Sequence, residues 1–389
     1  MISTADRLGD VKEYYFSVKL AEIKSMNDAG KDVINLGIGS PDMAPHPKVL
    51  QASKESLLAP TSHGYQSYKG TDELRNAMSD WYQKYFDVKL NPNTEVLPLM
   101  GSKEGIMHIS MAFVNPGDGV LVPNPGYPTY KSVSDLVQAN IINYPLNENN
   151  NWHPDFDYLE SLDLSGVKIM WVNYPNMPTG ADGSVGLFEK LVDFGKRHNI
   201  LIVNDNPYSF VLNENQISIL SIEGAKEVAI ELNSLSKASN MAGWRVGMVA
   251  GNEYYINNIL RVKSNMDSGM FLPVQLGAVE ALKLDREWYK EINKTYAIRK
   301  KAAHKLFDSL NCEYRQNEVG MFVWAKVPEG TSAEGLSDIV LKKANVFITP
   351  GMIFGSKGNN YLRISLCTPI GRIEEAIERV SKIEINSII

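Results

Sequence analysis

The sequence predicts an α/β fold: a large domain with a mostly parallel sheet between helices, followed by a smaller α+β domain. Between about residues 95 and 251, short β-branched and aliphatic runs alternate with helical patterns, which is typical of parallel strands joined by crossover helices. After residue 284 this alternation ends and a long charged helical stretch begins. With 389 residues, the chain is long enough for two packed domains.

The expected elements of the large domain follow one another in a regular order. Six strands are predicted, at residues 96–100, 119–123, 168–173, 200–205, 228–235 and 246–251. Helices are predicted between them, at residues 102–113, 128–138 and 184–198. In the last of these, Leu187, Leu191 and Phe194 are spaced along one face, as the inward side of a crossover helix requires.

The smaller domain is expected to combine a long helix with a few strands. Its predicted elements are a helix at 286–310, a strand at 321–327, a helix at 332–343, a strand at 361–366 and a last helix. The first forty residues hold an amphipathic stretch at 15–29 but no sheet of their own, so we expect them to pack against this carboxyl-terminal domain. We therefore predict an amino-terminal arm at 1–45, a large domain at 46–284 and a small domain at 285–389.

Composition excludes several classes of function. A net charge of −6 argues against a nucleic-acid partner, and no apolar run is long enough to cross a bilayer. The amino terminus has charges of both signs and lacks the apolar core of a secretory signal, so we expect a cytoplasmic protein. The two cysteines, Cys312 and Cys367, show no disulfide or metal-ligand spacing, and no metal site is predicted. Small molecules are the expected partners.

Polar residues that follow three of the predicted strands are candidates for ligand binding, because ligands of open α/β sheets bind beyond the carboxyl ends of strands. The first group is the turn Met100-Gly101-Ser102-Lys103, which leads into a helix. Free backbone N–H groups at such a turn suit an anion such as phosphate, although an ordinary strand-to-helix connection has the same appearance. No GxGxxG occurs in the chain, which argues against a dinucleotide site.

The second and third groups supply a carboxylate and an amine. Asp205 ends an apolar strand and is followed by Tyr208, an arrangement that also occurs where an aspartate caps a turn. Lys237 lies among small residues in Ser-Leu-Ser-Lys, and Arg245 follows in Gly-Trp-Arg-Val-Gly. A desolvated lysine is a competent amine nucleophile, whereas a solvated lysine in such a loop has no chemical role.

These motifs, taken together, resemble the class I/II aminotransferases of fold type I, which depend on pyridoxal 5'-phosphate. The resemblance covers nearly the whole chain and is carried by motifs in the family's order: NPGYP at 124–128, NYPNMPTG at 173–180, DNPY at 205–208, SLSK at 234–237, Arg245 and Arg363. It is closest to the branch that contains the LL-diaminopimelate, alanine and aspartate aminotransferases. This family would give the large domain a seven-stranded type of sheet.

The resemblance implies roles for four residues around the cofactor ring. Lys237 would hold the cofactor as a Schiff base and then act as general acid and base. Asp205 would pair with the protonated pyridine nitrogen and keep the ring an electron sink. Tyr208 would donate to the phenolic oxygen of the ring. Tyr127 would stack on the ring face, although a tyrosine in such a turn is also a common packing residue.

Further residues would bind the cofactor phosphate. Ser102, Lys103, Ser234 and Arg245 would supply two cations and a helix terminus to a nearly dianionic group. Tyr65 resembles the tyrosine that reaches the phosphate of the neighbouring subunit. The resemblance therefore implies a homodimer with shared active sites.

Three residues are expected to contact the substrate. Arg363 lies in a predicted strand of the small domain, where it could form an edge salt bridge or clamp a carboxylate, and the resemblance favours a clamp on the substrate α-carboxylate. Gly39 resembles the amino-terminal segment whose backbone approaches that carboxylate. Tyr14 would lie over the substrate.

One position departs from the family. Met177 directly precedes Pro-Thr-Gly, where the family has an asparagine that hydrogen-bonds the ring oxygen. Losing one such bond costs about 0.5–1.5 kcal/mol, so cofactor binding should survive. Asn176 is the nearby candidate to take over this contact.

The predicted function is transfer of an amino group between an L-amino acid and a 2-oxo acid in ping-pong half-reactions. Candidate donors are LL-diaminopimelate, alanine and aspartate, with 2-oxoglutarate as acceptor. A pyridoxal-phosphate-dependent C–S β-lyase on the same fold is the main alternative. A non-catalytic sensor module would need an appended DNA-binding segment or a lost lysine, and a dinucleotide-dependent oxidoreductase would need a glycine fingerprint; the sequence shows none of these.

Overall fold

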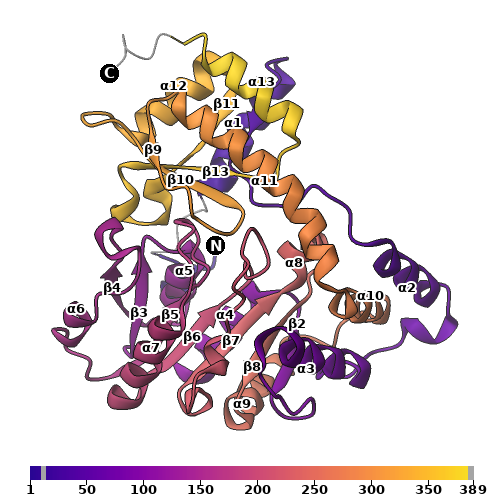
Figure 1. The fold of residues 1–389 in the computed structure, drawn as a ribbon. Coiled ribbons are helices and arrows are strands. Elements are labelled where there is room, and N and C mark those ends of the chain that lie inside the picture. Colours follow the sequence, from indigo (N-terminus) through magenta and orange to yellow (C-terminus); the bar gives the residue numbers. More distant parts are fainter. Residues whose placement is uncertain (10–14, 384–389) are drawn as a thin grey trace.

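A computed structural model describes residues 1–9 and 15–383. Its centre is a seven-stranded sheet with strand order β2-β8-β7-β6-β5-β3-β4 (Figure 1). Only β8 runs against its neighbours, so the sheet is mostly parallel, as predicted. The strands are β2 (Val96–Leu99), β3 (Gly119–Asn124), β4 (Asn140–Pro145), β5 (Val167–Val172), β6 (Leu201–Asp205), β7 (Ala229–Ser234) and β8 (Gly247–Gly251).

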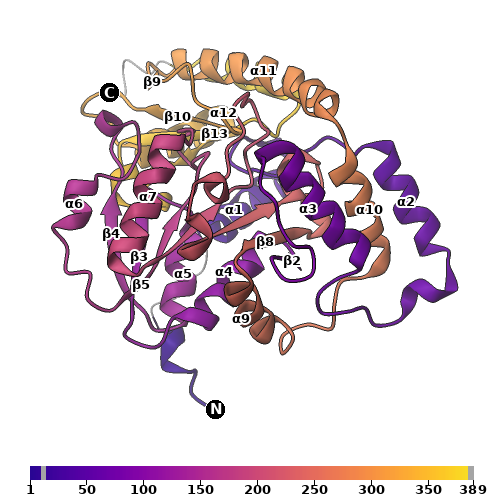
Figure 2. The same ribbon diagram turned by 60° about the horizontal axis from the view of Figure 1, so that its bottom comes forward.

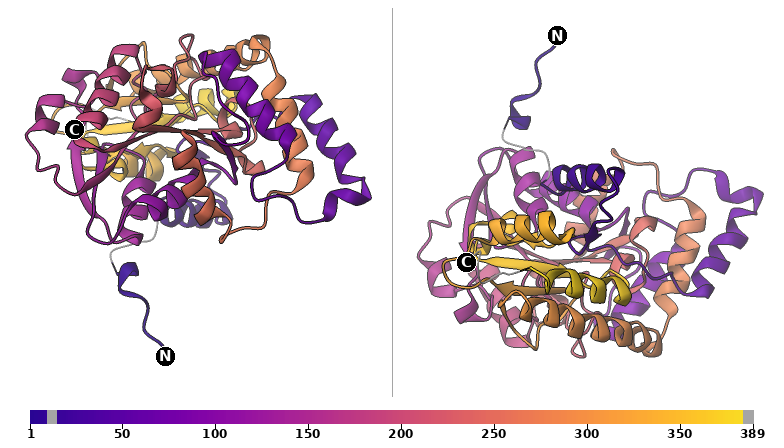
Figure 3. Two further views of the ribbon diagram at one scale, coloured as in Figure 1. Left: turned by 90° about the horizontal axis from the view of Figure 1, so that it is seen from below. Right: turned by 90° about the horizontal axis from the view of Figure 1, so that it is seen from above.

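Helices cover both faces of this sheet (Figure 3, left). The inner strands are accordingly apolar on both sides, as is usual for a covered parallel sheet. In β5, Ile169 and Trp171 belong to the hydrophobic cluster of one face, whereas Met170 and Val172 belong to that of the other. The alternation follows from the period of two residues in a strand. It leaves the ends of the strands as the places where polar residues can meet a ligand.

The crossover helices begin close to where the sequence predicts them. For example, α7 begins after Ser184, whose hydroxyl accepts a hydrogen bond from the N–H of Leu187 at 3.1 Å, and it ends at Asn199 in the left-handed conformation. Three helices lie together beside the β2–β8 edge (Figure 2). These are α2 (Pro47–Leu57), α3 (Asp72–Phe86) and α10 (Leu272–Lys283). The others around the large sheet are α4 (Ser102–Phe113), α5 (Pro128–Leu136), α6 (Phe156–Glu160), α7 (Val185–His198), α8 (Leu235–Ala238) and α9 (Glu253–Lys263).

The last hundred or so residues form a second, antiparallel sheet with helices. Its strand order is β12-β13-β10-β9, and its helices lie at the top of Figure 1. The strands are β9 (Glu313–Tyr314), β10 (Phe322–Lys326), β12 (Thr349–Pro350) and β13 (Tyr361–Ser365). The helices are α11 (Arg286–Asp308), α12 (Ala333–Ala344) and α13 (Ile370–Val380).

The amino-terminal segment packs against this carboxyl-terminal part, as expected. The short strand β1 (Ile34–Asn35) pairs in parallel with β11 (Val346–Phe347), and the helix α1 (Tyr15–Asp28) lies beside them (Figure 1). Lys19 of α1 forms an ion pair with Asp338 of α12 at 3.0 Å. The two ends of the chain therefore build one structural unit.

The strand β4 was not predicted. It is the edge strand of the large sheet, and its first residues are largely solvent-exposed, so it lacks the apolar run that marks the inner strands. The domain boundaries at residues 45 and 284 stay a prediction. No helix within residues 1–9 and 15–383 is long and apolar enough to cross a membrane.

Candidate active site

A cavity of about 460 Å³ lies beyond the carboxyl ends of β5, β6 and β7, and residues of the carboxyl-terminal part also line it. Most of the predicted site residues meet here. They are Gly39, Ser102, Lys103, Tyr127, Asp205, Tyr208, Ser234, Lys237, Arg245 and Arg363. The fold thus brings together residues from widely separated motifs.

Asp205, the last residue of β6, is buried inside the cavity wall. Its Oδ2 accepts a hydrogen bond from the hydroxyl of Tyr130 at 2.9 Å, whereas its buried Oδ1 has no hydrogen-bond partner among the described residues. Burial raises the pKa of Asp205 to about 6, against the opposing effects of the Tyr130 hydrogen bond and the Lys237 charge. An acceptor of this kind suits a ligand N–H.

Lys237 lies in the short helix α8, which follows β7 directly. Burial lowers the pKa of its amine, because the charged form loses hydration. The amine donates to the backbone oxygen of Gly39 at 2.5 Å. This contact links the lysine to the amino-terminal segment, and the lowered pKa favours the neutral amine that a nucleophile requires.

Two tyrosines line the same cavity as Asp205 and Lys237. Tyr127 precedes α5 and makes an edge-to-face contact with Tyr130 at a centroid distance of 5.6 Å. Tyr208 is buried, and its ring makes an edge-to-face contact with Phe322 at 5.7 Å. Burial raises the pKa of both phenols, so they are protonated donors at neutral pH.

The beginning of α4 faces the cavity. Gly101 has a φ of 87°, and a Cβ at this position would lie 2.1 Å from Nη2 of Arg245. The absence of a side chain therefore lets the guanidinium lie directly on the turn. Ser102 and Lys103 form the first turn of α4, and Ser234 ends β7 on the same side. Two cations and a helix amino terminus thus converge.

Arg363 lies on β13 and is buried on the opposite wall. Its Nη2 donates to the backbone oxygen of Gly37 at 2.6 Å, and its Nη1 donates to the sulfur of Met177 at 3.2 Å. Gly39 lies close by, and a Cβ on it would be 2.5 Å from the ring of Phe322. The Arg363 guanidinium is thus held at the cavity wall by contacts with two other segments.

Two predicted residues that the structure describes, Asn176 and Tyr65, do not line the cavity. Asn176 is buried within its own loop, where its side chain hydrogen-bonds the Asn173 backbone oxygen and the Thr179 hydroxyl. Tyr65 is 93% exposed on the outer surface, so its predicted contact would need a second subunit. Tyr14 lies outside the described residues.

Several cavity residues were not predicted. Tyr130 lies in the first turn of α5, three residues after Tyr127, and no sequence signal marked it. Asn173 accepts a hydrogen bond from the Met177 N–H at 2.7 Å and donates to the backbone oxygen of Asp205. Three further lining residues, Ser17, Leu20 and Phe354, come from segments without a recognisable motif.

A group of possible metal ligands lies outside the cavity wall. Ligand atoms of Glu104, His108 and Asp267 come within 4.8 Å of one another. Asp267 already forms an ion pair with buried Lys263 at 2.8 Å, and Glu104 accepts a hydrogen bond from the Met100 N–H at 2.7 Å. Because these contacts already use both carboxylates, we propose no metal here.

Comparison with known proteins decides the family. The model of the family "Aminotransferase class I and II" matches residues 31–380. The chain belongs to this family. The resemblance seen in the motifs is therefore confirmed, and the protein is an aminotransferase of a family that depends on pyridoxal phosphate in general.

Individual relatives match this aminotransferase along nearly its whole length. An LL-diaminopimelate aminotransferase of Aquifex aeolicus is 42% identical over 99% of this chain and 100% of its own length. A second one, from Dehalococcoides mccartyi, is 39% identical over 96% of this chain and 97% of its own. A substrate-bound structure of BacF from Bacillus subtilis is 34% identical, with a TM-score of 0.92 and coverage of 98% of both chains. The predicted fold is confirmed, and these comparisons do not support the C–S β-lyase alternative.

Proposed function

We propose that this aminotransferase binds pyridoxal phosphate in the cavity and is covalently attached to it through Lys237. Three features of the site fit the cofactor. The buried Oδ1 of Asp205 suits the N–H of a protonated pyridine ring. The turn at Gly101, with the Arg245 guanidinium on it, suits the phosphate. Lys237 lines the same cavity, and its amine has a lowered pKa.

The residues of the chain would then share the work of transamination. When bound, pyridoxal phosphate supplies an electron sink for the electron pair that the substrate Cα retains on losing its proton. Lys237 removes that proton, since a less basic amine is neutral in a larger fraction of molecules near pH 7. Asp205 holds the ring nitrogen protonated, and Tyr208 donates to the ring oxygen. Arg363 grips the α-carboxylate and so directs the Cα–H bond toward Lys237.

We further propose LL-diaminopimelate as the amino donor and 2-oxoglutarate as the acceptor. The observation that carries this proposal is the 42% identity, along the full length of both chains, to an LL-diaminopimelate aminotransferase. Alanine and aspartate are the other candidate donors. All of these donors share the α-carboxylate that Arg363 would hold. They differ in their side chains, which other residues of the cavity would contact.

A spectroscopic titration tests the proposal. The purified protein should show a visible absorption band that the donor bleaches and the oxo acid restores, and LL-diaminopimelate should act at lower concentration than alanine or aspartate. Lys237→Ala should lack both the band and turnover. A wild-type protein that stays colourless with added cofactor would contradict cofactor binding. Pyruvate release from a cysteine conjugate without any oxo acid would instead favour the lyase.

We also propose that the active unit is a homodimer in which Tyr65 reaches the partner's phosphate site. The exposed face around Tyr65 supports this, since it carries large apolar side chains. His63 and Phe271 are in ring contact at 6.0 Å, so the segments around them are neighbours. The exposed apolar residues of these segments are Leu57, Leu58, Tyr65, Tyr68, Met266 and Phe271. A patch of this kind is typical of an interface.

Light scattering and activity together test the dimer. Leu58→Asp should yield monomers with little activity, whereas Val185→Asp, a charge at an exposed position at the start of α7 and away from this face, should leave the dimer and the activity intact. Tyr65→Phe should keep the dimer but weaken cofactor binding several-fold. A wild-type protein that is monomeric and fully active would contradict the proposal.

A further inference from the structure

Met177, the residue that departs from the family, contacts Arg363, which is the proposed carboxylate clamp. Met177 is only 4% exposed and lines the cavity, and its sulfur accepts a hydrogen bond from Nη1 of Arg363 at 3.2 Å. Its backbone is fixed as well, because its N–H donates to Oδ1 of Asn173 at 2.7 Å. The thioether is thus held in place beside the guanidinium rather than merely filling space.

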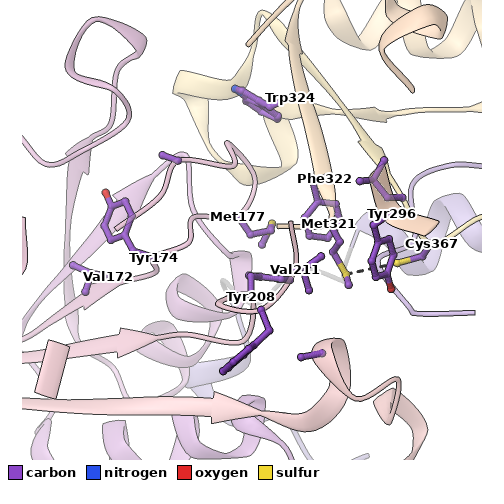
Figure 4. Close-up of a cluster of buried hydrophobic side chains, with 14 of the residues drawn as sticks. Val172, Tyr174, Met177, Tyr208, Val211, Tyr296, Met321, Phe322, Trp324 and Cys367 are labelled. Atoms are coloured by element: carbon purple, nitrogen blue, oxygen red, sulfur yellow. Dashed lines mark hydrogen bonds between the residues drawn. The ribbon is translucent and has the colours of Figure 1, made fainter. Parts of the chain in front are cut away.

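Two aromatic rings also lie against the same guanidinium. The centre of the Arg363 guanidinium lies 4.1 Å from the ring centroid of Phe322 and 4.6 Å from that of Phe354. Met177 and Phe322 belong to one buried cluster at the junction of the two parts of the molecule (Figure 4). A ring face attracts a cation but does not determine the direction in which its N–H groups point. That direction must come from contacts at its edge.

Two edge contacts supply the direction. The Gly37 backbone oxygen accepts from Nη2 at 2.6 Å, and the Met177 sulfur accepts from Nη1. A guanidinium carries five N–H donors in a rigid fork, so contacts at two of its nitrogens constrain where the whole group points. A thioether accepts but does not donate hydrogen bonds, so Met177 cannot act on the ring oxygen as the family's asparagine does.

We propose that Met177 is a positioning residue that orients Arg363 for the substrate carboxylate. This inference rests on the proposed function, in which Arg363 grips that carboxylate. In place of the family's asparagine, this chain thus has a residue that accepts a hydrogen bond from Arg363 and cannot donate one to the ring oxygen. Carboxylate affinity should therefore depend on the sulfur, independently of the cofactor's electronic state.

Calorimetric titration of the holoenzyme with glutarate tests this, because glutarate has two carboxylates but neither an amine nor a keto group. Met177→Leu keeps the volume and removes the acceptor. We expect its glutarate Kd to rise about three- to tenfold, the effect of losing one hydrogen bond. Met177→Asn restores an acceptor and should bind glutarate within about twofold of wild type, the conservative rescue that a positioning role requires.

Met321→Leu is the matched control. Met321 is fully buried in the same cluster, and its sulfur lies 3.6 Å from Cys367 instead of the clamp (Figure 4). Met321→Leu should bind glutarate as wild type does, whereas its thermal midpoint should change to a similar extent as that of Met177→Leu. In steady-state assays, the loss in Met177→Leu should fall on KM rather than kcat.

The outcomes separate the two proposals. Equal glutarate Kd values for wild type and Met177→Leu would overturn the positioning role while leaving the proposed function intact. A parallel loss in Met321→Leu would also overturn it, because packing would then explain the effect. If wild-type protein binds no glutarate and Arg363→Lys also leaves turnover unchanged, Arg363 does not bind the substrate carboxylate. The proposed function is then contradicted as well.

Discussion

Replacing Tyr130 with phenylalanine should raise the pKa of Asp205. The change removes the hydroxyl that donates to Oδ2 at 2.9 Å but keeps the ring, which stacks on Trp171 with an interplanar angle of 6°. A hydrogen bond to a charged group contributes about 1.5–3 kcal/mol. Since one pKa unit corresponds to about 1.4 kcal/mol, the pKa should rise from about 6 by roughly one to two units.

This shift has a definite sign in the stability of the cofactor-free protein. The folded-state pKa of Asp205, about 6, is above its ordinary value of 3.8, so the contribution to stability is full below pH 4 and is lost as pH rises through 6. In Tyr130→Phe, this contribution to stability should continue to be lost for another one to two pH units above pH 6, because the pKa of Asp205 is higher. The free energy of unfolding of the variant, relative to wild type, should therefore fall by about 1.5–3 kcal/mol between pH 6 and pH 9.

Urea unfolding at a series of pH values measures this difference. Tyr174→Phe is the control, since Tyr174 is also buried and its hydroxyl donates to the Trp152 backbone oxygen at 2.8 Å, away from Asp205. Its destabilisation should not change with pH. The reasoning is refuted if the stability difference of Tyr130→Phe is the same at pH 5 and pH 9, or if Tyr174→Phe shows the same pH dependence.

Two other predictions concern the substrate segment and a buried carboxylate. Gly39→Ala places a Cβ 2.5 Å from the Phe322 ring, so catalytic efficiency should fall by about 1–3 kcal/mol, measured as kcat/KM; an unchanged value would show that the segment moves freely. Burial raises the pKa of Glu231 to about 7 from 4.5, so folding loses stability as pH rises through 7. Glu231→Gln should remove this dependence, and its stability relative to wild type should rise by about 3 kcal/mol between pH 4 and pH 8 in urea unfolding; parallel curves would contradict the shift.

The site could be predicted from the sequence where chemistry and strand ends coincide. Asp205 and Lys237 follow apolar strands directly, so the same pattern that predicts the sheet also places them at its carboxyl edge. Arg363 was identifiable because it interrupts an apolar strand. For these three residues the local sequence determines their place on a strand or at its end. The packing of the elements determines only the distances between their side chains.

Other parts depend on packing that no local pattern records. The Tyr130 hydroxyl reaches Asp205 only because of how α5 lies on the sheet. Asn176 was the candidate to replace the family's asparagine as donor to the ring oxygen. Its side-chain amide instead forms hydrogen bonds within its own turn, where partners lie close in the sequence. The departure at Met177 was visible, yet its partner Arg363 lies far away in the chain. The edge strand β4 was missed because exposure removes the apolar signal.

The pairing of β1 with β11 bears on how the protein is made. All seven strands of the large sheet have been synthesised by Gly251, so that half can begin to fold while the chain is still growing. Gly37 and Ile34 are synthesised early. The hydrogen bond from Arg363 to the Gly37 oxygen and the pairing of Ile34 with Val346 can form only after the carboxyl-terminal residues have been made. A nascent or truncated chain can therefore assemble the lysine and the anion-binding turn before it can hold a substrate carboxylate, so competence to bind the cofactor should precede competence to act on an amino acid.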